Sequence, residues 1–214
     1  MANVNVAYGL KPIGKLGQAT NSTGMTEYRI AVANTNPIFQ GMPVIPLAAG
    51  VIDDLQAAAG GTVSIVGVFG GCEYTSSSTG KVVWSNYWPG SGADTAYPVK
   101  AFVYDDPNQL FSVATSNVVA GADTEAEVRT AVFANIALAT GNSGSTTTGM
   151  SSATADLNTI AATNTLALRI MGIVEDPDNA DFTVAGIPLI VRINNHFNAP
   201  TGSIAAGTVS TTGV

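Results

Sequence analysis

The sequence predicts a mainly β protein: a barrel- or sandwich-like body with at most one short helix, an extended N-terminal arm and a mobile C-terminal tail. Short apolar segments rich in β-branched residues recur along most of the 214 residues, which is typical of strands. The 23 glycines and 10 prolines punctuate these segments as turns. A single segment has the spacing of an amphipathic helix. Many short strands with tight turns and little helix indicate a barrel or a sandwich.

Residues 1–25 are predicted to form the extended arm, because they contain four glycines and show no periodicity. Their larger apolar side chains, Tyr8, Leu10 and Ile13, are too few to build a core. We therefore expect them to pack on a neighbouring subunit, where Lys11 and Lys15 would meet an acidic partner. The alternative is a floppy terminus without a role.

A β-rich body is predicted over residues 26–197, with a possible subdivision near residue 120, followed by a flexible tail at 198–214. Gly70 and Gly71 are expected to stop the clearest strand, which begins at Thr62. The segments expected to be β are, in chain order, residues 28–32, 37–47, 62–69, 81–84, 97–104, 109–115, 165–174 and 182–197.

Residues 124–139 can be interpreted in two ways. Thr124 and Glu127 have the spacing of a capping box, which predicts a helix start. A helix would place four apolar side chains on one face: Val128, Val132, Phe133 and Ile136. Apolar residues also alternate between Val132 and Leu138, so a strand is the alternative for the second half.

The composition indicates a component of an assembly. Charged residues make up 11% of the chain, against about 25% in an ordinary soluble domain, and the mean hydropathy is +0.27. A surface so poor in charge is expected to be covered by other subunits. The net charge of −7 and the 8 scattered Lys and Arg residues exclude nucleic acid as the main partner. We expect no membrane span and no leader peptide, and hence synthesis in a cytoplasm.

Few residues could carry chemistry, and we expect no enzyme and no cofactor. His196 is the single histidine and Cys72 the single cysteine. No nucleophile motif accompanies His196, which we interpret as a hydrogen-bonded residue at a strand end, and Cys72 as a small core residue. An acidic cluster at Glu175, Asp176, Asp178 and Asp181 is the candidate for a cation such as Ca²⁺. A solvated acidic turn is the favoured interpretation.

The large aromatic residues Trp84, Tyr87 and Trp88 gather in one segment. Buried, they would anchor a loop or a subunit contact, where Trp and Tyr are frequent. Exposed, they could stack on sugar rings, as in a carbohydrate-binding module.

Several short motifs occur in an order that resembles a group of virion proteins of tailed bacteriophages, common in phages of marine and cyanobacterial hosts. They start with residues 1–5 and Tyr8-Gly9-Leu10-Lys11-Pro12 and span most of the chain. The others are residues 67–74, 84–89, 103–107 with Phe111, 148–151 and 191–196. The resemblance implies a head decoration, or cement, protein on the capsid exterior, with no catalytic residues.

Composition and resemblance together predict binding to the major capsid protein and self-association as a homotrimer. The alternatives are a tail or head–tail joining protein and, from another class, a carbohydrate-binding module.

Overall fold

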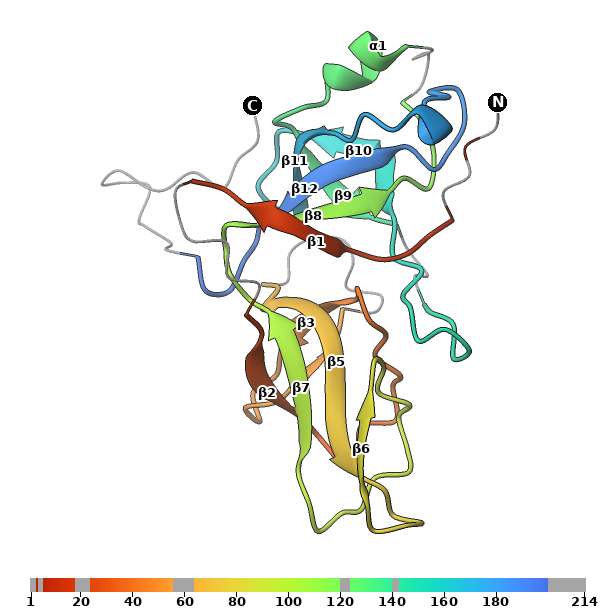
Figure 1. The fold of residues 1–214 in the computed structure, drawn as a ribbon. Coiled ribbons are helices and arrows are strands. Elements are labelled where there is room, and N and C mark those ends of the chain that lie inside the picture. The colour runs from red at the N-terminus through yellow and green to blue at the C-terminus, as the bar shows by residue number, and fades with distance from the viewer. Residues whose placement is uncertain are drawn as a thin grey trace, which may run out of the picture.

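The computed structural model describes residue 3 and residues 6–17, 24–55, 64–119, 124–139 and 143–199. The fold is mainly β, with 44% strand and 5% helix, which confirms the predicted class. Two bodies, each built on one sheet, lie one above the other (Figure 1). The predicted tail, apart from residues 198 and 199, and the predicted boundary near residue 120 lie outside the described residues.

The first body is a barrel. Its strands run in the order β3-β4-β2-β7-β5-β6, and an additional pairing of β3 with β5 closes the five strands other than β6 into a ring. The end strand β6 therefore extends the barrel on one side. The strands are β2 (Thr26–Ile30), β3 (Pro43–Pro46), β4 (Ile52–Asp54), β5 (Gly67–Thr75), β6 (Val82–Ser85) and β7 (Val99–Tyr104).

The second body is a curled sheet with the order β1-β8-β12-β11-β9-β10. A bridge between Thr115 and Ala155 brings the end of β8 beside the start of β10. The strands are β1 (Lys11–Lys15), β8 (Gln109–Ala114), β9 (Asn135–Leu138), β10 (Ala155–Ala161), β11 (Leu168–Ile173) and β12 (Pro188–Ile193). The body also carries α1 (Glu125–Arg129) and a 3-10 turn at Pro177–Asn179.

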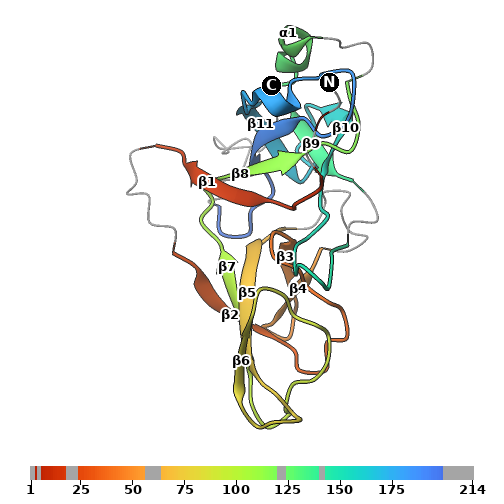
Figure 2. The same ribbon diagram turned by 45° about the vertical axis from the view of Figure 1, so that its right-hand side comes forward.

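The chain changes body at residues 105–108. One hydrophobic cluster lies within the first body, whereas the other is built mainly by the second body and also includes Leu55, Ile65 and Val68 of the first. The arm is an exception to this sequential division, because β1 joins the second body although β2 follows in the first (Figure 2). Near the C-terminus the bodies are tied again. Ile65 N donates to Asn195 O at 2.8 Å, and Phe197 N donates to Ile65 O at 2.8 Å.

Both interpretations of residues 124–139 hold in part. The Thr124 amide donates to the Glu127 carboxylate at 2.9 Å, so the predicted capping box forms and starts α1. The helix ends at Arg129, and β9 occupies the alternating second half. Phe133, with φ 74°, lies in the left-handed region within the turn between them.

Gly70 and Gly71 do not stop a strand, contrary to the prediction. Strand β5 continues through both glycines to Thr75. The pairing of β5 with β7 shifts register between Phe69 and Gly71, so the glycines mark a bulge inside a long strand. Turn-forming residues alone could not distinguish a bulge from an end. Residues 62 and 63 of the predicted strand lie outside the described residues, and residues 64–66 precede β5, with Ile65 in an isolated bridge.

Candidate functional site

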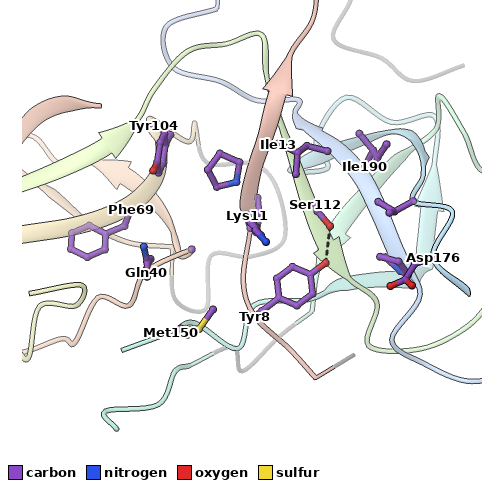
Figure 3. Close-up of a pocket in the computed structure, with 15 residues that line it drawn as sticks. Tyr8, Lys11, Ile13, Gln40, Phe69, Tyr104, Ser112, Met150, Asp176 and Ile190 are labelled. Carbon is purple, nitrogen blue, oxygen red and sulfur yellow. Dashed lines mark hydrogen bonds between the residues drawn. The ribbon is translucent and has the colours of Figure 1, made fainter. Parts of the chain in front are cut away.

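A groove of about 730 Å³ crosses β1 at the junction of the two bodies (Figure 3). The arm supplies its centre, with Tyr8, Leu10, Lys11 and Ile13 among the lining residues. The first barrel contributes Phe69 and Tyr104 on one side of β1, and β12 contributes Pro188 and Ile190 on the other. Four of the five arm residues predicted to bind a partner thus line one groove.

The arm is held on its own chain by a strand pairing. β1 pairs antiparallel with β8, from Lys11 opposite Ser112 to Lys15 opposite Gln109. A register shift between Pro12 and Gly14 interrupts the ladder, and the Gln109 side chain donates to Gly14 O there at 2.7 Å. Residues 11–15 are therefore a strand of the second body, so the arm does not need a neighbour to be ordered.

Leu10 anchors the arm between the two bodies. It is 1% exposed and belongs to the core of the second body, while its amide donates to Gly41 O in the first body at 2.8 Å. Gly9 makes this approach possible. Its φ is +74°, and a Cβ there would lie 2.7 Å from Gly41 O. Deletion of the arm would therefore remove part of the core as well as the groove.

Tyr8 lines the groove and is held in place by a hydrogen bond with Ser112. The two hydroxyl oxygens are 2.7 Å apart (Figure 3). Burial raises the pKa of Tyr8 above its usual value, and the nearby Asp176 carboxylate adds to this increase. The phenol is consequently neutral at physiological pH and lines the groove as a hydrogen-bonding group.

Tyr8→Phe is expected to lower the free energy of unfolding by about 1 kcal/mol, because the Ser112 hydroxyl then loses its partner. Urea denaturation of the full chain measures this change. Ser112→Ala is the matched control, and the double variant should cost less than the sum of the two single changes. Strictly additive losses would contradict a direct Tyr8–Ser112 interaction.

The two lysines of the arm have different surroundings. Lys15 Nζ lies 2.7 Å from Asp106 Oδ2, and this hydrogen-bonded lysine holds the pKa of Asp106 below its ordinary value. Lys15 thus meets an acidic residue of its own chain. Lys11 is exposed and faces the groove, and Ile13 is 45% exposed there. Of the five arm residues predicted to bind a partner, Lys11 and Ile13 are the exposed ones.

The three aromatic residues singled out from the sequence do not form one surface. Trp88 is fully buried and its indole N–H donates to Asn34 O at 3.2 Å. Tyr87 is half-buried and stacks on Phe39, with ring centroids 5.6 Å apart. Trp84 is 67% exposed and stacks on Phe102 at 5.4 Å. Trp88 and Tyr87 therefore support the first barrel, whereas Trp84 is available at its surface.

Carboxylates of the acidic cluster accept hydrogen bonds within their own turns. Asp176 accepts hydrogen bonds from the Asp178 amide and from the Asn179 side chain, and Asp181 accepts one from the Thr183 amide. Within the described residues, no group of three or more His, Cys, Asp or Glu side chains could hold a metal ion.

Cys72 and His196 are interior residues. Cys72 is 1% exposed, and burial raises its pKa to about 12, so the thiol is protonated. His196 is 4% exposed; its Nδ1 accepts from the Asn198 amide at 3.1 Å. It lies beyond the end of β12 and bridges to Ile65 of the first body. Neither side chain lines the groove.

Several groove residues carry no sequence signal that could have identified them. Phe69, Tyr104, Ser112 and Met150 come from segments far apart in the chain, and only the fold brings them beside the arm. No protein-family model matches the sequence, and no curated protein or solved structure is significantly similar to it. Among the described residues, the helices are too short and insufficiently apolar to span a bilayer.

Proposed function

We propose that the protein is a structural component of a phage virion that binds the outside of the capsid lattice as a decoration, or cement, protein. The observation that carries the proposal is the open, largely apolar groove built by the arm, with Ile13 and Lys11 exposed on it. The proposed occupant is a surface segment of the major capsid protein. The protein would be made in the host cytoplasm and would act on the virion exterior without enzymatic activity.

Three features support this function. The low charge of the chain suits a surface that is covered by neighbouring subunits. The two bodies are joined by the arm and by the strand-like contact at Ile65, so a contact at the groove involves both bodies at once. The ordered motifs that resemble phage virion proteins span most of the chain. Many modest contacts made together on a lattice give high avidity.

The groove can be tested with Ile13→Asp and capsids of the phage that encodes the chain. The variant is expected to bind capsids at least tenfold more weakly, because a carboxylate would be buried without a partner in an apolar contact. Val6→Asp is the matched control, since Val6 is 79% exposed and does not line the groove. Co-sedimentation over a range of protein concentrations measures both. Equal loss, or no loss, in the two variants would contradict docking through the groove.

The assembled state separates the structural alternatives. A homotrimer is the expected state, and light scattering of the purified chain measures its mass. Rings or tubes in negative-stain images would instead favour a tail or head–tail joining protein.

The carbohydrate-binding alternative now depends on Trp84. Trp88 is fully buried and cannot stack on a sugar without opening the barrel, whereas Trp84 retains an exposed ring. Glycan binding that is lost in Trp84→Ala but kept in Ile13→Asp would support that alternative.

A further inference from the structure

Strand β6 (Val82–Ser85) has β5 as its one strand neighbour in the described sheet and extends the first barrel at its lower end (Figure 1). Two of its side chains are exposed to solvent: Val82 is 57% exposed and Trp84 is 67% exposed. An open sheet edge presents backbone N–H and C=O groups that can pair with another strand.

The hydrogen bonds of the β5–β6 hairpin fix which backbone groups face outward. Ser76 N donates to Lys81 O at 2.8 Å, so Lys81 bonds toward the β5 side of the hairpin. Backbone groups alternate sides along a strand, and the β5–β6 register is unbroken from Cys72–Ser85 to Thr75–Val82. Val83 therefore bonds toward β5, and the backbone groups of Val82 and Trp84 point away from it.

The other end strands carry features that protect an edge, and β6 does not. β1 contains Pro12, lysines at both ends and a register shift. β10 has a register shift in its pairing with β9. The sequence of β6, Val-Val-Trp-Ser, contains no charge and no proline, and its pairing is regular. Charges, prolines and bulges are the usual means of preventing edge-to-edge pairing.

We propose that β6 pairs antiparallel with β6 of a second copy of this chain, about a two-fold axis at Val83. Val82 then lies opposite Trp84 of the second copy, and the outward backbone groups of both residues exchange hydrogen bonds at two equivalent places. The same arrangement sets an aromatic side chain against a β-branched one, which is a favourable cross-strand pair. Trp84 is already held in place, because its ring stacks on Phe102 with an interplanar angle of 12°.

The charge distribution favours a second copy as the occupant. The chain has a net charge of −7, so most acidic surfaces of two copies repel each other. The β6 edge contains no acidic residue, and Lys81 precedes it. Two such edges can meet without placing like charges opposite each other within the paired strands. The contact is small compared with the roughly 800 Å² per partner of a standard interface, so the pair is expected to be weak in dilute solution.

This inference goes beyond the capsid-binding function and does not depend on it. Antiparallel edge pairing closes with two copies, so it doubles the mass of whatever unit the remaining contacts form. A trimeric unit would be joined to further trimers by the same edge.

The test is the mass of the full chain by sedimentation equilibrium up to several hundred micromolar, compared with Val82→Pro. Proline removes an N–H that is not used within the sheet, so the fold is retained while the pairing is blocked. Val82→Lys is a second variant that blocks the edge by charge repulsion. The parent is expected to reach twice the mass of both variants, with unchanged near-UV circular dichroism. Equal masses for parent and variants would overturn the proposal.

The register is tested by cross-linking in a Cys72→Ala background. Oxidised Val83→Cys is expected to give a covalent dimer, because the two copies of residue 83 face each other across the axis. Trp84→Cys is not expected to cross-link, because its two copies lie more than one residue step apart. Cross-linking through residue 84 alone would overturn the proposed register.

Discussion

Trp88→Ala is expected to lower the free energy of unfolding by about 3–5 kcal/mol, the cost of removing a large aromatic side chain from a packed core. Trp88 is 0% exposed, its indole N–H donates to Asn34 O, and its ring meets Tyr74 edge-on at 5.4 Å. The backbone of Trp88 also forms an antiparallel bridge with Ile38, so this residue is held by main-chain as well as side-chain contacts. Chemical denaturation followed by far-UV circular dichroism measures this change without relying on tryptophan fluorescence.

Trp84→Ala is the matched control, because it removes the same type of side chain from the surface of the same barrel. Trp84 is 67% exposed and contributes mainly through its stacking on Phe102. We expect a loss of about 1 kcal/mol, typical of one aromatic pair. Comparable losses in the two variants would contradict the assignment of Trp88 to the core and Trp84 to the surface.

Local patterns predicted the parts of the fold that depend on neighbours in sequence. The Thr124–Glu127 spacing identified the start of α1, and the alternation noted as the alternative for the second half of that segment fits β9. The expected β segments include β7, β8, β11 and β12, whereas β10 was not predicted. Glycines were less informative. Gly70 and Gly71 belong to a bulge inside β5, but glycines are equally compatible with the end of a strand. A local pattern does not reveal whether a partner strand continues beside it.

The groove depends on contacts that no local pattern encodes. Tyr8 and Ser112 are 104 residues apart, yet their hydroxyl groups are hydrogen-bonded. The arm residues singled out from the sequence have separate roles, because residues 11–15 pair with β8 as a strand of the second body. Leu10 and Lys15 hold the arm on its own chain, while Lys11 and Ile13 remain accessible. Amphipathic spacing cannot make this distinction, because the partner strand β8 is distant in sequence.

Lowering the pH from 6.5 to 4 is expected to reduce the free energy of unfolding through His196. Burial lowers the pKa of His196 to about 4, and the nearby Arg192 acts in the same direction, against the opposing effect of Asp105 and Asp106. Its Nε2 is buried without a hydrogen-bond partner in the described structure. The folded protein therefore keeps the ring neutral where the unfolded chain, with a pKa of about 6.5, takes up a proton.

Stability rises with pH wherever the unfolded state binds more protons. The effect of His196 is therefore absent above pH 6.5, grows by about 1.4 kcal/mol per pH unit below it, and reaches at most about 3 kcal/mol near pH 4. Asp106 has a lowered pKa, so its contribution is lost only below about pH 4. The pKa of Asp181 is also lowered, by hydrogen bonds from Thr183, so its contribution is likewise lost only at the acid end of the window between pH 4 and 6.5.

His196→Gln tests the assignment, because an amide keeps a hydrogen-bonding side chain but does not titrate. Denaturation at several pH values between 4 and 7 should give a much flatter dependence for the variant than for the parent. A parallel pH dependence in both proteins would show that a residue other than His196 is responsible for the titration. A flat variant profile would assign the acid sensitivity to His196, which forms a β-bridge with Ile65 of the first body.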